Sequence, residues 1–334
     1  MDCCASPSTG QTDQGCFAVS LPSRRDVLAL GGAAAATTLV ERVVASPASP
    51  TPSKRTRLIL LGTAGGPTPK PNRAAPAQAV VIDDQVYIVD CGNGVARQMV
   101  LAGLRLDALR ALFITHHHSD HNADFGNLLL LAWSNNLAKP VDCFGPPPLR
   151  RMTRQFLALN DSDIKTRMAD EGRTDLQKLI RPHDIDRADE IYSDALVRVR
   201  CALVDHPPVR PSLAYRFDGP DRSIVFSGDT APSDSLVSLA AGADVLVHEV
   251  MHLPALDALI ATEPNAATLR EHLLASHTLT SQVGKIATRA GVKTLVLSHF
   301  VPGGYPFLAD EVWLDTVRPD FSGEIIVGRD LLEI

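Results

Sequence analysis

The sequence predicts a single α/β domain in which helices cover β-sheets, and three observations lead to this class. Short apolar runs typical of strands recur through residues 57–328, and helical patterns fall between several of them, mostly in the second half. No internal repeat and no low-complexity linker interrupts residues 57–334. One domain of about 280 residues therefore fits better than two, although about 150 residues per domain is the usual expectation.

The expected elements follow in chain order from these periodicities, and the first half is the more hairpin-rich. The strand runs are 57–62, 78–83, 85–90, 111–115, 141–144, 195–205, 212–217, 222–228, 244–248, 293–299 and 324–328. The helical patterns are 94–103, 122–137, 148–181 with breaks, 233–241, 265–276, 280–290 and 308–317.

Residues 1–45 have the features of a twin-arginine signal peptide. Arg24 and Arg25 precede a short apolar Ala/Gly-rich run at 27–40, and small residues suited to a signal peptidase follow. This order indicates a targeting segment, and the paired arginines indicate the twin-arginine route. We therefore expect a Pro/Ser-rich linker at 46–56, a periplasmic location and no stable membrane insertion once the signal is removed.

Composition excludes several classes of protein. Hydrophobic residues make up 45% and charged residues 21% of the 334 residues, which is typical of a globular chain and not of a disordered one. The net charge of −6 gives no general attraction for nucleic acid, although it leaves a local basic patch open. Aromatic residues are only 5%, which disfavours a base-stacking surface. Behind the signal only Cys91, Cys143 and Cys201 remain, so one disulfide among them is left open.

The histidines carry the chemistry. All 11 lie between residues 116 and 299, and four fall in the heptapeptide 115–121, directly after an apolar strand run. Open α/β sheets bind ligands at such strand ends. The pattern His-x-His-x-Asp-His offers nitrogen and oxygen donors that suit Zn²⁺, Mn²⁺ or Fe. These four donors are His116, His118, Asp120 and His121.

Three further donors end other strand runs, namely His206, Asp229 and His299. Each alone is more often a polar group with an ordinary structural role. Together with the heptapeptide they supply seven ligands, which is enough for two metal ions that share one carboxylate.

Other histidines and glycines resemble known motifs without fitting them. HEVMH at 248–252 spells H-E-x-x-H, but zinc proteases need that motif on a helix, and here it continues a strand run with Pro254 close behind. The glycines at 62–66 lack dinucleotide-binding spacing and are expected to form a turn bordering the site. The histidines expected to be surface or core residues, and not ligands, are His117, His183 and His272.

The seven donors, in this order, resemble the signature of the metallo-β-lactamase superfamily. SGDT (227–230), LVHE (246–249), ASHTLTSQ (275–282) and VKTLVLSHF (292–300) further resemble its branch of ribonuclease Z and metal-dependent arylsulfatases. The resemblance covers about residues 57–300 and implies an αββα sandwich with two divalent ions at one edge. Zinc is expected, with manganese or iron as alternatives. The implied ligands are His116, His118 and His206 for one ion, Asp120, His121 and His299 for the other, and Asp229 between them.

The same resemblance implies a hydrolase that uses a metal-activated hydroxide on an ester bond. Asp120 would orient the hydroxide, and His277 would protonate the leaving oxygen as general acid. Glu249 would orient His277. The sequence His277-Thr278-Leu279 is an imperfect match to the His-Ser-Thr of the branch.

The sequence favours a small-molecule substrate and no nucleic acid. Only 23 positions separate His206 from Asp229, which leaves no room for the arm with which many ribonuclease Z enzymes grip RNA. An acidic, exported chain also opposes an RNA substrate. A sulfate ester or phosphodiester is the first expectation. The alternatives are a lactonase or β-lactamase type of ring opening and, both disfavoured, a ribonuclease Z-like endonuclease and a metal-binding protein without turnover.

The segment 148–192 mixes charges of both signs with apolar residues at helical spacing. It is expected to be a helical insert. Two interpretations stay open: a solvated cover of the domain, or a lid or homodimer surface that shapes the substrate pocket.

Overall fold

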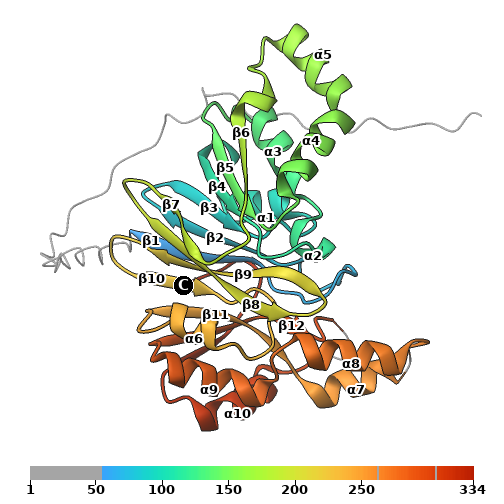
Figure 1. The fold of residues 1–334 in the computed structure, drawn as a ribbon, viewed down its shortest axis with the longest axis vertical. Helices are drawn as coiled ribbons and strands as arrows, with labels where there is room; N and C mark the ends of the chain where they lie inside the picture. Colours follow the sequence, from blue (N-terminus) through green and yellow to red (C-terminus); the bar gives the residue numbers. More distant parts are fainter. Residues whose placement is uncertain (1–54, 262, 305–306) are drawn as a thin grey trace, which may run out of the picture. The chain divides into compact units, whose positions relative to one another are not determined.

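The computed structural model describes residues 55–334 apart from 262, 305 and 306. The signal at 1–45 and most of the linker at 46–56 lie outside the described residues. Two seven-stranded sheets pack face to face, with helices on their outer sides (Figure 1). This arrangement confirms the expected αββα sandwich.

The first sheet has the strand order β14-β1-β2-β3-β4-β5-β6. Its strands are β1 (Thr56–Gly62), β2 (Ala77–Ile82), β3 (Gln85–Val89), β4 (Leu109–Phe113), β5 (Val141–Gly145), β6 (Ile180–Asp184) and β14 (Leu332–Glu333). The helices of this half are α1 (Val95–Leu101), η1 (Leu106–Ala108), α2 (Ser119–Asn122), α3 (Phe125–Ser134), α4 (Leu149–Leu159), α5 (Asp161–Glu171) and η2 (Leu176–Leu179).

The second sheet has the strand order β13-β12-β11-β10-β9-β8-β7. Its strands are β7 (Asp189–Ser193), β8 (Arg198–His206), β9 (Val209–Asp218), β10 (Ser223–Phe226), β11 (Val245–Met251), β12 (Thr294–Val301) and β13 (Glu324–Val327). The helices of this half are α6 (Asp234–Leu239), α7 (Leu253–Ile260), α8 (Ala266–Ser276), α9 (Thr280–Ala290), α10 (Asp310–Val317) and η3 (Arg318–Asp320).

Strands buried on both faces explain why the strand runs are continuously apolar. In β1, Leu58 and Leu60 belong to the core between the two sheets, whereas Ile59 and Leu61 belong to the core under α1 and α3. A third core joins the second sheet to α6, α9 and α10. Burying each such side chain contributes about 1.5–3 kcal/mol, so the two sheets and their helices are held together mainly by these layers.

The segment 148–192 contains the helices α4 and α5 and the short 3-10 helix η2, which ends at residue 179. Behind it, β6 adds an edge strand to the first sheet and β7 adds one to the second. Both strands have polar sequences, because one side of an edge strand faces solvent. The expected insert is therefore helical over most of its length and ends in two edge strands.

Cys91, Cys143 and Cys201 are buried and free, so no disulfide joins the cysteines that the structure describes. Within the described ranges, no helix has the length and apolar character needed to cross a membrane.

Candidate metal centre

The ends of strands from both sheets meet at one edge of the sandwich and carry the seven predicted ligands. β4 leads into the heptapeptide 115–121, His206 ends β8, and Asp229 follows β10. β3 and β4 run parallel in one sheet, as do β10, β11 and β12 in the other, so their carboxyl ends share an edge.

His299 reaches this edge through a β-bulge in β12. Its neighbours Ser298 and Phe300 pair with the consecutive residues Glu249 and Val250 of β11, so His299 is the extra residue. Its φ of 44° lies in the left-handed region, which few non-glycine residues adopt. A bulge re-aims a side chain, and here it turns the imidazole of His299 toward the other donors.

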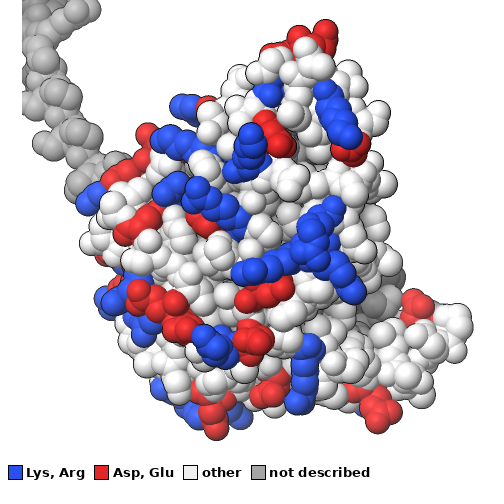
Figure 2. All heavy atoms as spheres, turned by 45° about the horizontal axis from the view of Figure 1, so that its top comes forward, with Lys and Arg blue, Asp and Glu red and all other residues white. Residues whose placement is uncertain are grey.

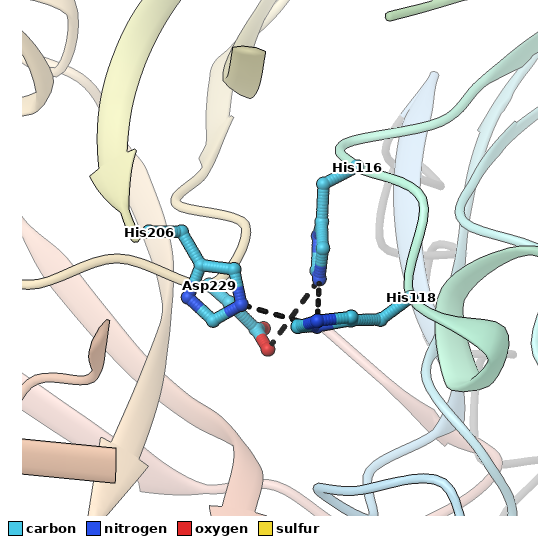
Figure 3. A group of neighbouring side chains, drawn as sticks. All are labelled: His116, His118, His206 and Asp229. Carbon is cyan, nitrogen blue, oxygen red and sulfur yellow. Dashed lines mark hydrogen bonds and ion pairs between the residues drawn. The ribbon is translucent and has the colours of Figure 1, made fainter. Parts of the chain in front are cut away.

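The first group of donors comprises His116, His118, His206 and Asp229 (Figure 3). Their ligand atoms all lie within 4.8 Å of one another. His118 Nδ1 is 3.0 Å from His116 Nε2 and 3.1 Å from His206 Nε2. Asp229 Oδ2 is 3.9 Å from His116 Nε2. Three imidazoles and one carboxylate thus converge on a single point.

The second group comprises Asp120, His121 and His299. His121 Nε2 is 3.2 Å from His299 Nε2 and 3.5 Å from Asp120 Oδ2. Asp229 Oδ2 also lies 3.3 Å from His121 Nε2 and 3.2 Å from His299 Nε2. The same oxygen of Asp229 therefore faces both groups, as a bridging ligand must.

The charge of the cluster fits two divalent cations. Burial lowers the pKa of His206 to about 4, although Asp229 opposes it, so this imidazole is neutral as a metal ligand must be. Burial acts to lower the pKa of His121, but the carboxylates of Asp229, Asp120 and Asp90 raise it well above its usual range. Three buried carboxylates concentrate negative charge here that bound cations would compensate.

Two buried polar atoms in this cluster lack a protein partner, namely Asp229 Oδ1 and His299 Nδ1. Buried polar atoms are nearly always paired, so the free Oδ1 of the bridging Asp229 fits a carboxylate whose oxygens are available to cations. His299 Nδ1 lies on the far side of its ring from the cluster, because His299 Nε2 is the atom that faces the other donors. The structure brings all seven predicted donors together, and their role as metal ligands stays a prediction.

Residues behind the donors fix the orientation of the imidazoles. Asp90 Oδ2 accepts from His121 Nδ1–H at 2.8 Å, and Asp90 Oδ1 accepts from the Thr115 backbone N–H at 2.8 Å. The carbonyl of Ser276 accepts from His206 Nδ1–H at 2.9 Å. These bonds leave the Nε2 lone pairs of His121 and His206 pointing into the cluster. Asp90 had no role in the sequence prediction, although its place at the end of β3 matches that of the ligands.

We expect Asp90→Asn to weaken zinc binding by about 10–100-fold, the usual range for a partner that supports a metal ligand. With one oxygen kept on the Thr115 N–H, the asparagine amide would face His121 Nδ1. His121 would then carry its proton on Nε2, where the metal must bind. Titration of the metal-free protein with zinc, followed by competition with a chelator, measures the change. An unchanged affinity would show that Asp90 does not set the tautomer.

The His277–Glu249 pair lies directly beside the metal ligands. His277 Nδ1 is 2.8 Å from Glu249 Oε2, and Glu249 Oε1 accepts from the Thr230 backbone N–H at 2.6 Å. Burial acts to lower the pKa of His277, but the Glu249 carboxylate outweighs it and raises the pKa to about 9. The ring of His277 lies 5.0 Å from that of His206. His277 can therefore hold a proton at the site, as a general acid requires.

The motifs set aside in the sequence take ordinary structural roles. His248 and Glu249 lie on strand β11 and not on a helix, and His252 caps the short helix α7 by accepting from the Ala255 N–H. His183 pairs with Asp142 at 2.9 Å. The glycine turn borders the site as expected, since the Gly66 N–H donates to Asp120 Oδ2 at 3.1 Å. The exception is His272, which lines the cavity beside the cluster and is not a simple surface residue.

A family model described as the metallo-β-lactamase superfamily matches residues 74–299. Proteins named ribonuclease Z are similar over most of the chain. The protein from Mycobacterium bovis (strain BCG / Pasteur 1173P2) is 36% identical over 277 residues, which cover 82% of this chain and 96% of the relative. The protein from Mycobacterium tuberculosis (strain ATCC 25618 / H37Rv) is 34% identical over the same shares.

Solved structures share the fold at lower identity. The short form of human tRNase Z has a TM-score of 0.62 at 20% identity and covers 83% of this chain and 98% of its own. The metallo-β-lactamase fold protein YhfI from Bacillus subtilis has a TM-score of 0.60 at 20% identity and covers 84% and 98%.

These relatives overturn one expectation. The prediction of a small-molecule substrate and no nucleic acid is wrong, because the similar proteins are named for ribonuclease activity. That prediction rested on the net charge, on the expected export and on the short spacing between His206 and Asp229. None of these features shows where individual cationic side chains lie on the surface.

Proposed function

Because the chain belongs to the metallo-β-lactamase superfamily, we propose that it is a metal-dependent phosphodiesterase that cleaves RNA. The observation that carries this proposal is the buried His277–Glu249 pair at the edge of the seven converging donors. The ribose oxygen that leaves during RNA cleavage is a poor leaving group and needs a proton, which His277 is placed to give. The names of the relatives at 34–36% identity support RNA as the polymer.

Each residue then has a defined task. His116, His118, His206 and Asp229 would hold one divalent ion, and Asp120, His121 and His299 the other. Two such ions, expected to be zinc with manganese or iron as alternatives, would when bound polarise the phosphate oxygens and activate a water molecule. Asp120 accepts from the Gly66 N–H, which helps to hold its carboxylate beside the other donors, where it would orient the hydroxide. Glu249 keeps His277 Nδ1 occupied, so His277 Nε2 carries the mobile proton.

Exposed arginines on α4 provide local positive charge for binding phosphate, although the net charge of the chain is negative. Arg150, Arg151 and Arg154 are exposed, and no carboxylate lies within ion-pair distance of them among the described residues. On the neighbouring α5, by contrast, Lys165 and Arg167 pair with Asp161 and Asp163. In Figure 2, which tilts the α5 end toward the viewer, several Lys and Arg side chains lie together below that end.

The start of α4 is also tied to the metal site. His117, inside the heptapeptide, donates from Nε2–H to the carbonyl of Pro146 at 2.7 Å. Pro146 lies three residues before α4 (Leu149–Leu159). This hydrogen bond joins the segment before α4 to the heptapeptide, and the proposal is that the arginines of α4 hold an RNA strand whose phosphate reaches the cluster.

Replacement of Arg150, Arg151 and Arg154 by glutamine together is expected to raise KM for RNA. It should also flatten the salt dependence of binding by about 0.7 in log–log slope for each phosphate that the protein no longer neutralises. The rate on bis-p-nitrophenyl phosphate should stay unchanged, because that diester cannot reach α4. The matched control is Lys165→Gln with Arg167→Gln on α5, where the charges are already paired. If both variants behave alike, α4 does not bind the substrate.

The proposal as a whole is tested with protein reconstituted with zinc or manganese. The substrates are a structured RNA with a single-stranded 3′ extension, bis-p-nitrophenyl phosphate, an aryl sulfate, an acyl-homoserine lactone and a cephalosporin. We expect cleavage of the RNA and the phosphodiester. Hydrolysis of the sulfate, lactone or cephalosporin with the RNA left intact would refute the proposal and favour one of the other ester or amide classes.

We include export in the proposal on the strength of Arg24 and Arg25 and the apolar run behind them. The enzyme would then meet RNA outside the cytoplasm. Fractionation of cells that make the full chain, before and after replacing both arginines by lysine, measures the location.

A further inference from the structure

A cavity of about 550 Å³ opens directly beside the seven donors. His118, Asp120, Asp229, His277 and His299 line its inner end. The remaining lining comes from the glycine-rich loop after β1, from Ser119, from residues 301–304 at the end of β12 and from the helical hairpin α7–α8. Cavities of about 300–1,000 Å³ accommodate small organic groups, so this one is large enough for a substrate group next to the reacting phosphate.

One wall of the cavity is aliphatic. Leu256 and Ile260 of α7 are buried, and Leu269 and Leu273 of α8 are half-buried. They pack against one another in a small apolar cluster at the hairpin and also line the cavity. A half-buried leucine that borders an open cavity gains further burial when an apolar face is placed against it.

The opposite wall carries a cation. Lys70 is half-buried, and its Nζ donates to Thr68 Oγ1. Within the described part of the chain, no carboxylate oxygen lies within 4.0 Å of its ammonium nitrogen. A Cβ placed on Gly304 would lie 2.9 Å from Lys70 Cδ, so the glycine makes room for the lysine stem at the cavity wall. Lys70 is free to meet an anion that enters the cavity.

We infer that this cavity is a nucleoside subsite, in which one nucleoside flanking the cleaved bond packs on the α7–α8 wall while the next phosphate along the chain meets Lys70. The inference rests on the proposed function, since it takes RNA as the polymer. Leucine and isoleucine offer area and no hydrogen bonds. His272 and the exposed Glu263 are the polar residues that line the cavity on this side. The aliphatic part of the wall therefore binds a nucleobase without distinguishing one base from another.

In this arrangement the aliphatic wall and Lys70 contribute separately to the affinity for a ligand. The cations expected at the inner end attract the reacting phosphate, whatever group it carries. The aliphatic wall contributes only when a flat apolar group is present, and Lys70 contributes only when a second phosphate is present. Three ligands of increasing size can measure each contribution in turn.

The test measures binding to the zinc-loaded protein by isothermal titration calorimetry. The probes are ribose 5-phosphate, uridine 5′-monophosphate and uridine 3′,5′-bisphosphate. We expect uridine 5′-monophosphate to bind at least tenfold more tightly than ribose 5-phosphate, which lacks the base. We expect the bisphosphate to bind more tightly again, and Lys70→Ala to remove only this last gain.

Leu269→Glu and Leu273→Glu should each abolish the preference for the nucleotide over ribose 5-phosphate. The matched control is Leu159→Glu, since Leu159 is 82% exposed on α4, away from the cavity. Circular dichroism and zinc content check that each variant is folded and loaded. The wild-type comparison needs no variant, so a misfolded one does not weaken the test.

Equal affinity for uridine 5′-monophosphate and ribose 5-phosphate, or no binding of either, would overturn the subsite. If the nucleotide preference is present but the RNA is not cleaved, the subsite stands and the proposed RNase activity fails. If the RNA is cleaved without a nucleotide preference, the proposed function stands and the subsite fails.

Discussion

Replacement of Asp229 by alanine is expected to remove at least one of two bound metal ions per chain and nearly all of the phosphodiesterase activity. Asp229 Oδ2 lies within 3.2–3.9 Å of ligand nitrogens from both donor groups, so its loss weakens both at once. A catalytic metal supplies several kcal/mol of charge stabilisation in the transition state, and 1.36 kcal/mol is tenfold in rate. We therefore expect a rate lower by about a thousandfold or more.

Elemental analysis of purified wild-type protein should find close to two metal ions per chain under metal-replete conditions. The variant should hold one or none. Asp205→Ala is the matched control, because Asp205 is exposed and precedes a predicted ligand without facing the cluster. A wild-type protein that holds no metal, or a fully active Asp229→Ala, would remove the assignment of a two-metal centre.

His277→Ala is expected to separate substrates by their leaving group. A positioned general acid contributes about 10²–10⁴-fold to a rate when the leaving oxygen needs a proton. The ribose oxygen of RNA needs one, whereas p-nitrophenolate does not. We therefore expect cleavage of RNA to fall by at least about 100-fold, and turnover of bis-p-nitrophenyl phosphate to change little. Steady-state rates of the same preparation on both substrates give the comparison.

Two further variants sharpen this result. Glu249→Gln should reproduce the pattern more weakly, because the amide leaves His277 in place but no longer supports its charged form. His183→Ala removes a histidine of the edge strand β6 that pairs with Asp142 of β5, and it should change neither rate. Equal losses of His277→Ala on both substrates would exclude the general-acid role and leave His277 as a structural neighbour of the metal ligands.

The sequence alone was sufficient for the α/β class and for the set of candidate ligands. Buried strands read as apolar runs, and the residues that follow those runs, such as His116 after β4 and Asp229 after β10, must lie at a sheet edge. The apolar run of a buried strand involves only residues that are neighbours in the chain, so it can be recognised in the sequence. The edge strands β6 and β7 escaped prediction because their sequences, IRPHD and DEIYS, are too polar to show an apolar run.

Only the tertiary structure decided which neighbours complete the site. His299 faces the cluster because a bulge against β11 adds one residue to β12. No local sequence pattern predicts that extra residue. Asp90 acquires its partner His121, and Lys70 its place opposite α8, through contacts between segments far apart in the chain. Residue type determines what chemistry a side chain can offer. Packing between elements determines which side chains lie close together. It also leaves the arginines of α4 exposed to solvent, which the net charge of the chain does not reveal.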